Sequence, residues 1–387
     1  MAHIELIELC KSFAGRAALH GLRLSIEQGE LVSLLGPSGC GKTTTLRIVA
    51  GFEMPDSGGV WLGGQNLLEV APNRRGMGVV FQSYALFPHL TAWKNVAFGM
   101  KMTGRPGADI RRRVPELLEL VGLGDAAGKY PHEMSGGQQQ RIALVRALAI
   151  EPRMLLLDEP LSALDAVVRV SLRDEIRRIQ TTLGMTTLYV THDQEEALAI
   201  SDRIAVIRDG RIEQVGTSED IYARPATRFV AGFIGKMNQL PGRVVATRQG
   251  YVQCGAHKLQ VPPETIAKLE VGSVATVLVR PETIMMTPAG SDIDAATNTV
   301  AIGGRNKFAA CVEGVTFLGS VRRIVLDAAG QRLVADVSGT ALGQVRRGDR
   351  MTISFPVDAC RVIGDDRPPS GISEERDQAE AMRGRSA

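Results

Sequence analysis

The stretch GPSGCGKT, residues 36–43, has the residue types and the spacing of a loop that binds the phosphates of a nucleotide. The apolar run ELVSLL precedes it and TTTLRIVAG follows it, which predicts a strand before the loop and a helix after it. Gly39 and Gly41 let backbone amides converge on phosphates, and the start of the helix adds positive potential. Lys42 supplies a point charge, and Thr43 offers a hydroxyl to Mg²⁺. A glycine-rich turn without a ligand is the alternative interpretation.

Two carboxylates end the apolar run MLLLDEP, where a buried charge pair is costly unless a cation or a reaction uses it. Asp158 suits the ligand shell of Mg²⁺, and Glu159 suits a general base for an attacking water. His192 ends the similar run TTLYVTHD, where an imidazole can hydrogen-bond a γ-phosphate. The alternatives are an acidic pair that caps a helix and a histidine with a structural role.

The hydrophobic pattern predicts the elements that position these residues. Up to about residue 235, short apolar runs such as GELVSLLG and RMLLLDEP alternate with helical patterns, which is typical of the parallel sheet of an α/β fold. Ligands bind beyond the carboxyl ends of such strands, so Ser38, Asp158, Glu159 and His192 should face one crevice.

Two further patterns belong to the same part of the chain. Strand signals vanish over about residues 83–150, where helical periodicity predicts an inserted helical subdomain. The stretch RIAVIRDGRIEQVG predicts a hairpin that turns at Asp209 and Gly210. Together these patterns predict a first domain over residues 1–236.

From about Met237 the pattern changes to short strands separated by turns, which predicts small β-barrels over residues 237–363. The weakly patterned residues 289–307 are expected to form a loop between them. The segment 364–387 is polar and poor in large apolar residues, so we expect a disordered tail there.

Composition narrows the class of protein. With 387 residues the chain is too long for one ordinary domain, and its net charge of +3 is too small to indicate nucleic acid or a membrane surface. The five cysteines are scattered without CxxC spacing, so we expect neither a disulfide framework nor a zinc site, and a reducing cytoplasm fits best. The N-terminus lacks the pattern of a signal peptide, and no apolar run approaches the ~20 residues of a membrane span.

Five motifs occur in order along the chain: GPSGCGKTTTLR, FQSYALFPHLT, MSGGQQQR, LLLDEPLSALD and THD. With them the chain resembles the ATP-binding subunits of ABC-type importers. The β-rich part from about Met237 is similar to the paired OB-like regulatory domain that follows the ATPase in importers of polyamines, iron, sulfate and sugars. The resemblance therefore covers nearly the whole chain and implies an α/β P-loop NTPase followed by an all-β OB-like domain.

The resemblance implies roles for single residues around the phosphates. It makes Gln82 a residue that touches Mg²⁺ and the attacking water, Asp158 a metal contact beside Thr43, Glu159 the general base and His192 the switch histidine. The implied phosphate-binding loop, with Lys42 as its charged residue, comprises Gly36, Pro37, Ser38, Gly39, Cys40, Gly41, Lys42, Thr43 and Thr44.

The resemblance also implies contacts on the other faces of the nucleotide. Phe13 matches a ring that stacks on adenine; the family often has Tyr there, but the π-face remains, and stacking worth about 1–3 kcal/mol should survive. Core packing is the alternative for Phe13. Residues 162–165, which end at Asp165, match the D-loop that links two sites. The family signature is matched by Ser135, Gly136, Gly137, Gln138 and Gln139, after a Met134 that replaces the usual Leu with a similar volume.

The signature motif also makes physical sense as a site. Ser135, Gly136 and Gly137 precede a helix, so a hydroxyl and two amides can form a second anion-binding cap. The resemblance implies that this cap covers the γ-phosphate of another subunit across a two-fold axis, so that a homodimer holds two shared sites for ATP and Mg²⁺. From the residues alone, a glycine turn with a simple N-cap is the alternative.

The function implied by the resemblance is ATP hydrolysis that energises a solute importer, from the cytoplasmic face of the cell membrane. The implied partners are two transmembrane permease subunits and, indirectly, an extracytoplasmic solute-binding protein. The stretches YALFPHLTAWKNVAFGMKM and FLGSVRRIVLD look most similar to spermidine/putrescine importers. Importers of ferric iron, 2-aminoethylphosphonate, sulfate or sugars are the alternatives.

A soluble ABC ATPase that acts on nucleic acid through an OB-type tail is the alternative from a different class. The sequence argues against it, because there is one cassette, little net positive charge and few tail aromatics for base stacking. Nucleic acid is therefore not an expected partner. The tail aromatics considered are Tyr251, Phe308, Phe317 and Phe355.

Overall fold

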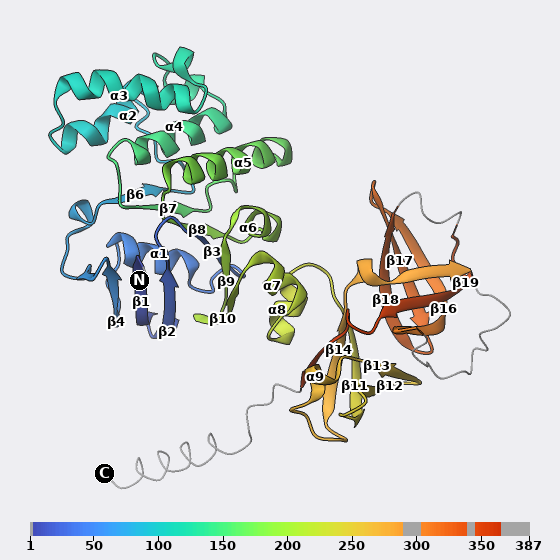
Figure 1. The fold of residues 1–387 in the computed structure, drawn as a ribbon. Coiled ribbons are helices and arrows are strands. Elements are labelled where there is room, and N and C mark those ends of the chain that lie inside the picture. Colours follow the sequence, from blue (N-terminus) through green and yellow to red (C-terminus); the bar gives the residue numbers. More distant parts are fainter. Residues whose placement is uncertain (1–2, 289–302, 339–344, 365–387) are drawn as a thin grey trace, which may run out of the picture. The chain divides into compact units, whose positions relative to one another are not determined.

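The computed structural model describes residues 3–288, 303–338 and 345–364. The chain divides into two compact units, Met1–Pro225 and Ala226–Ala387 (Figure 1). This division precedes the boundary expected after residue 236, because helix α8 (Arg228–Phe233) contributes to the core of the second unit, where Ala231 packs with Leu278 and Ile363. The expected tail lies, from residue 365 onward, outside the described residues.

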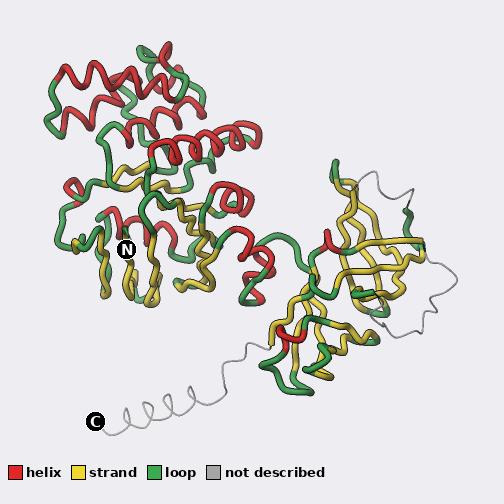
Figure 2. The backbone as a smooth tube through the Cα atoms, in the orientation of Figure 1, coloured by secondary structure: helices red, strands yellow, loops and turns green. Residues whose placement is uncertain are grey.

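A six-stranded sheet forms the centre of the first unit (Figures 1 and 2). Its order is β10-β9-β3-β8-β7-β6, and all neighbours are parallel except the hairpin β9–β10. The prediction of a parallel α/β sheet is confirmed. The strands are β3 (Leu31–Leu35), β6 (Met77–Val80), β7 (Met154–Asp158), β8 (Thr187–Thr191), β9 (Arg203–Arg208) and β10 (Arg211–Gly216).

The hairpin between β9 and β10 turns where the sequence predicts. Asp209 and Gly210 both have positive φ angles, 47° and 72°, as a tight two-residue hairpin turn requires. The turn also touches the phosphate-binding loop, because the Gly210 amide donates to the Cys40 carbonyl oxygen at 3.1 Å.

The first unit also contains an antiparallel sheet, whose strands come before and after β3 in the chain. The expectation that strands alternate with helices from the N-terminus onward is therefore wrong for this part of the chain. The order of this sheet is β2-β1-β4-β5. Along β1, Ile4, Leu6 and Leu9 are buried while polar neighbours are exposed, so the sheet covers the core with one face only. The strands are β1 (Ile4–Phe13), β2 (Arg16–Ile26), β4 (Ser57–Leu62) and β5 (Gln65–Asn66).

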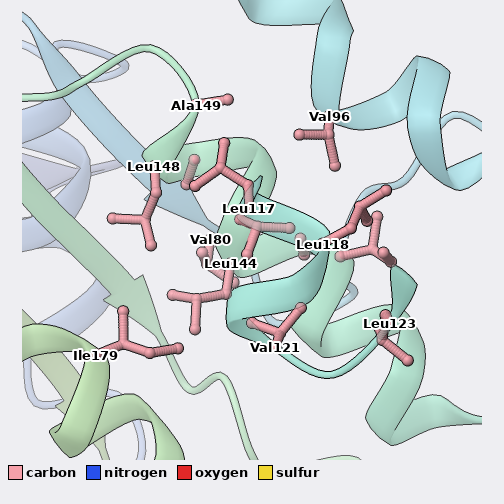
Figure 3. Close-up of a cluster of buried hydrophobic side chains, with 14 of the residues drawn as sticks. Val80, Val96, Leu117, Leu118, Val121, Leu123, Leu144, Leu148, Ala149 and Ile179 are labelled. Atoms are coloured by element: carbon pink, nitrogen blue, oxygen red, sulfur yellow. The ribbon is translucent and has the colours of Figure 1, made fainter. Parts of the chain in front are cut away.

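The residues between β6 and β7 contain helices and no strand. Figure 3 shows Val96 of α2, Leu117 of α3 and Leu144 of α4 in one buried cluster, which also includes Val80 of β6 and Ile179 of α5. The helical segment is therefore attached to the edge of the sheet by continuous apolar packing. The helices of the first unit are α1 (Lys42–Ala50), α2 (Ala92–Met102), α3 (Gly107–Leu120), α4 (Gly136–Leu148), α5 (Ala166–Leu183), α6 (Gln194–Ile200) and α7 (Ser218–Ala223).

The second unit consists of two five-stranded antiparallel sheets with a shared core, which confirms the all-β prediction. The sheet orders are β13-β12-β11-β14-β20 and β15-β19-β16-β17-β18. The first contains β11 (Asn238–Ala246), β12 (Tyr251–Cys254), β13 (His257–Gln260), β14 (Val274–Val279) and β20 (Arg361–Gly364), with α9 (Pro263–Ile266) beside it. The second contains β15 (Met285–Pro288), β16 (Arg305–Phe317), β17 (Val321–Ala328), β18 (Gln331–Ser338) and β19 (Arg350–Pro356).

The loop expected over residues 289–307 is wrong at its end, because Arg305 already pairs with Pro356 in β16 and β19. Residues 289–302 lie outside the described part of the chain. Among the described residues, no helix combines the length and the apolar composition that crossing a membrane would need.

Two buried asparagines join the sheets of the second unit. Asn238 of β11 accepts a hydrogen bond from the Val334 amide and donates to its carbonyl oxygen, at 2.7 and 2.8 Å. Asn306 of β16 makes the same pair with Gln260 of β13, at 2.8 and 2.8 Å. Each side chain thus takes the place of a strand residue and satisfies backbone groups that the sheets leave unpaired.

Replacing Asn306 by leucine should therefore loosen the junction between β13 and β16. The buried amide and carbonyl of Gln260 would lose their partners, which costs about 2 kcal/mol or more and speeds local hydrogen exchange roughly 30-fold. Exchange of the β13 and β16 amides in the full chain, followed by mass spectrometry, measures this change. Lys307→Leu, at the next and half-exposed position of the strand, is the matched control, and equal exchange rates in both variants would contradict the bridging role.

Candidate functional site

The strands β3, β6, β7 and β8 run parallel, so the loops that follow them meet at one edge of the sheet. The loop after β3 is the predicted phosphate-binding loop. Gln82 follows β6, Asp158 and Glu159 stand at the end of β7, and His192 follows β8. The contacts described below join Thr43, Gln82 and His192 to Asp158 or Glu159. Ser38 takes part in none of them, so its place in the expected crevice stays a prediction.

Glycines allow the loop after β3 to lie close to the backbone of neighbouring segments. A Cβ added to Gly36 would lie 2.2 Å from the Ile207 carbonyl oxygen, and Gly41 has a φ of 105°. Pro37, Ser38 and Gly39 are exposed at the top of the loop, whereas Cys40 is buried beneath them. The loop therefore presents its backbone to solvent directly before α1, whose first turn contains Thr43 and Thr44.

The Lys42 side chain folds back across the loop. Its Nζ donates to the carbonyl oxygens of Gly36 and Pro37, both at 2.8 Å, and Lys42 is only 5% exposed. Burial raises the pKa of the Cys40 thiol, and the positive charge of Lys42, whose Nζ lies 3.8 Å from that sulfur, opposes the rise. The ammonium group is thus held at the centre of the loop, where phosphate oxygens would meet it.

Thr43 and Asp158 bring two oxygens together at the base of the loop. The Thr43 hydroxyl donates to Asp158 Oδ1 at 3.1 Å. Burial raises the pKa of Asp158, while this hydrogen bond lowers it and the charge of Glu159 raises it further. Both oxygens are hard ligands of the kind that Mg²⁺ prefers, together with water and phosphate oxygens. The described residues hold no cluster of three or more His, Cys, Asp or Glu placed for a metal. Asp158 and Thr43 can supply two oxygen ligands, and water and phosphate oxygens would have to supply the others.

Glu159 lies at the centre of a polar cluster above that pair. Its Oε2 accepts from Gln82 Nε2 at 3.3 Å and lies 3.2 Å from His192 Nδ1. Its backbone has a φ of 44°, a left-handed conformation that costs energy in a residue other than glycine and is common at active sites. The conformation is held by the Glu159 amide, which donates to the Val190 carbonyl oxygen at 2.9 Å.

Ser162 joins this cluster, although it is only implied in the sequence as part of the D-loop. Its hydroxyl donates to the Glu159 carbonyl oxygen at 3.0 Å and accepts from Gln82 Nε2 at 3.3 Å. No local sequence pattern predicts its contact with Gln82, because the two residues lie 80 positions apart.

The signature motif lies at the N-terminus of α4, away from the residues just described. The Ser135 hydroxyl caps the helix by accepting from the Gln138 backbone amide at 3.3 Å, and Gln138 Oε1 accepts from the Ser135 backbone amide at 3.0 Å. Gly136 and Gly137 pack closely on Leu164 and Val168, so a Cβ on either would lie 3.2 and 3.0 Å from them.

A groove of about 390 Å³ opens between the first turns of α4 and α5. Asp165, which caps α5 by accepting from the Val168 amide at 3.0 Å, stands exposed beside it. The residues that line the groove are Ser135, Gly137, Gln138, Arg141, Val167, Val168, Ser171 and Leu172, and none of them belongs to the phosphate-binding loop.

Phe13 ends β1 with its ring 46% exposed, so it is not a core residue. The Lys11 Nζ lies 5.2 Å from the ring centroid and is anchored to Glu53 at 2.8 Å and to the Met54 carbonyl oxygen at 2.7 Å. Lys11 was not predicted as part of the site. Its position two residues before Phe13, on the same face of a strand, is the signal that points to it.

Comparison with protein families agrees with the order of the motifs. The ABC transporter family model matches residues 19–162, and the TOBE domain model matches residues 277–363. The chain is 48% identical over 339 residues to an Fe(3+) ions import ATP-binding protein of Rhizobium meliloti, which covers 86% of this chain and 84% of that protein.

Two other relatives are named for the import of different solutes. A sulfate/thiosulfate import ATP-binding protein of Chromobacterium violaceum is 48% identical over 324 residues, or 84% of each chain. A spermidine/putrescine import ATP-binding protein of Thermobifida fusca is 54% identical over 280 residues, or 71% of each chain.

The first unit also resembles a solved structure of an ATP-binding cassette. That structure is a dimer in a post-hydrolysis state, bound to ADP and Pi; it superposes with a TM-score of 0.51 and 32% identity, and covers 56% of this chain and 98% of its own. The motifs, the fold and the relatives agree, and the chain belongs to the ABC transporter family as an ATP-binding importer subunit with a C-terminal TOBE domain.

Proposed function

We propose that Glu159 is the general base of ATP hydrolysis in this importer subunit. The observation that carries the proposal is the position of its carboxylate, which lies next to Gln82 and His192 and one residue after the pair formed by Asp158 and Thr43. A carboxylate in that place can accept a proton from a water that attacks the γ-phosphate.

The neighbouring residues bind the phosphates, hold the metal ion and orient the water. Lys42, the backbone amides of the loop and the start of α1 bind the phosphates, and His192, which is exposed beside Glu159, hydrogen-bonds the γ-phosphate. Thr43, Asp158 and Gln82 would hold Mg²⁺, which would neutralise charge on the phosphate oxygens. Gln82 orients the water, because its amide already contacts the carboxylate of Glu159.

The complete site takes residues from two chains. The signature groove shares no lining residue with the phosphate-binding loop of its own chain, and the start of α4 can bind an anion such as a phosphate. Ser135, Gly136, Gly137 and Gln138 of one subunit therefore cover the γ-phosphate on the other, with Asp165 at the junction and the Phe13 ring on adenine. The dimeric state of the solved cassette supports a homodimer here.

The permease partners bind the surface formed by residues 81–100 and the loop after α1. Phe52 and Met54 are 51% and 53% exposed, and the Phe52 ring stacks on Phe81 with centroids 5.8 Å apart. Exposed apolar side chains grouped in this way are typical of a protein interface. Two permease subunits would hold the dimer at the cytoplasmic face of the membrane as a peripheral protein, below an extracytoplasmic solute-binding protein.

The cargo we propose is a polyamine, spermidine or putrescine. The support is the identity of 54% to the Thermobifida fusca protein over 280 residues; the iron and sulfate relatives are 48% identical over 339 and 324 residues. Ferric iron, sulfate, 2-aminoethylphosphonate and sugars are the other candidates, because cargo is selected by subunits other than this one.

Glu159→Gln should bind ATP with unchanged affinity and lower steady-state turnover at least 100-fold, because an amide cannot accept the proton of the water. Phosphate release and nucleotide binding measure the two effects. Glu151→Gln, at an exposed position that pairs with Arg105, is the control. Turnover above a tenth of the wild-type rate would remove Glu159 from the role of base.

Mixed dimers test whether the signature serves the partner's nucleotide. Lys42→Ala removes the phosphate charge and Ser135→Arg blocks the cap, so each homodimer should occlude no ATP. If the sites are shared, a mixed dimer has both substitutions in one nucleotide pocket and neither in the other. One ATP per dimer should then be occluded. Tagged and verified mixed dimers that occlude none, where wild type does, would contradict shared sites.

The cargo is tested on the solute-binding protein encoded beside this chain. Calorimetry should show binding of spermidine or putrescine, and the reconstituted importer should hydrolyse ATP faster when that protein is loaded with the polyamine. Binding of ferric iron, sulfate, 2-aminoethylphosphonate or a sugar in place of the polyamine would replace the proposed cargo and leave the role of Glu159 untouched.

A further inference from the structure

The guanidinium of Arg169, in the second turn of α5, connects two loops of the hydrolytic site. Its Nη2 donates to the Leu164 carbonyl oxygen at 2.9 Å, and its Nη1 donates to Asp193 Oδ2 at 3.1 Å. The side chains of Arg169 and Asp193 are only 32% and 26% exposed. A partly buried fork with two acceptors in different loops fixes both loops, which a single point charge would not do.

One end of this connection lies in the D-loop, beside the signature. Leu164 precedes Asp165, and its side chain is the group that a Cβ on Gly136 would meet, at 3.2 Å. In the proposed dimer these residues face the partner subunit. The carbonyl held by Arg169 therefore belongs to the part of the chain that the partner subunit would contact in the proposed dimer.

The other end lies directly beside the switch histidine. Asp193 follows His192, whose Nδ1 lies 3.2 Å from Glu159 Oε2. Asp193 also caps α6, because its Oδ1 accepts from the Glu195 and Glu196 amides at 2.8 and 3.2 Å. The backbone that carries His192 is thus followed directly by a residue that Arg169 holds.

Glu196 faces the same guanidinium from α6. Its Oε1 lies 3.7 Å from Arg169 Nε, and its Oε2 accepts from the Tyr189 and Thr191 hydroxyls at 3.1 and 2.8 Å. Thr191 in turn accepts from the Asp193 amide at 2.9 Å. The turn that carries His192 is therefore held from the strand, from α6 and, through Arg169, from the D-loop.

We propose that Arg169 is a positioning residue that couples the D-loop to His192, so that contact with the partner subunit places His192 for hydrolysis. The inference rests on the proposed function of His192 and deepens it. Arg169 touches neither Glu159 nor the phosphate-binding loop in the contacts described here, so it acts through Asp193 and Leu164.

The test compares Arg169→Gln with Arg177→Gln in the full chain. Arg177 lies two turns further along α5 and makes a similar pair with Asp202, at side-chain exposures of 35% and 36%, but contacts neither loop. We expect both variants to bind ATP within about threefold of wild type and to lose similar thermal stability. Turnover should fall at least 30-fold for Arg169→Gln and less than threefold for Arg177→Gln.

Two further variants give readouts that a merely structural role would not change. Arg169→Lys can satisfy one acceptor only, so it should restore turnover in part, with an unchanged KM. In single-turnover phosphate release, the double variant Arg169→Gln with His192→Ala should be as slow as His192→Ala alone, within about twofold. A double variant that is slower than His192→Ala by the factor that Arg169→Gln alone loses would overturn the coupling. Equal turnover in Arg169→Gln and Arg177→Gln would also overturn it.

The outcomes separate this proposal from the proposed function. If His192→Ala retains full turnover, the role of His192 is wrong, and the coupling fails with it. If His192→Ala is inactive while Arg169→Gln behaves like Arg177→Gln, only the coupling is wrong.

Discussion

The proposed hydrolytic site depends on the register of three buried strands, β3, β8 and β7, which lie side by side in the central sheet. Leu35 pairs with Thr191, and Asp158 pairs with Val190. The residues that follow these pairs are the phosphate-binding loop, His192 and Glu159, and they therefore lie at the same edge of the sheet. All three strands are buried along their length, and a slip of one residue would turn every side chain to the opposite face. Packing of the strands thus fixes the geometry of the chemistry.

The site also needs a local departure from regular backbone. A strand that simply continued past Asp158 would carry Glu159 to the opposite face, because side chains alternate. The left-handed φ of Glu159 turns its carboxylate toward Gln82 and His192, and the bonds to Val190 and Ser162 hold that turn. Strain at this residue is offset by the surrounding hydrogen bonds.

The two units use buried polar groups in different ways. In the second unit, Asn238 and Asn306 satisfy backbone groups completely within the fold and so fix one sheet against the other. In the first unit, the Asp158 carboxylate is nearly buried, and the hydrogen bond from the Thr43 hydroxyl leaves further acceptor capacity on its two oxygens. Such capacity is what a cation shared with a nucleotide would use.

The sequence by itself determined the loop chemistry and the order of the motifs, because a loop such as residues 36–43 is defined by neighbours in the chain and by the strand and helix around it. It also determined the parallel sheet and the change to β structure in the second part. The N-terminal antiparallel sheet was not predicted, because strands followed by helices were expected there and not a strand such as β1, along which buried and exposed residues alternate. Tertiary structure alone decided the contacts between distant residues: Gln82 with Glu159, 77 residues apart, and Arg169 with Asp193, 24 apart. Such contacts depend on how strands and helices pack, and no local pattern of residues records which side chain a distant loop brings within hydrogen-bonding distance.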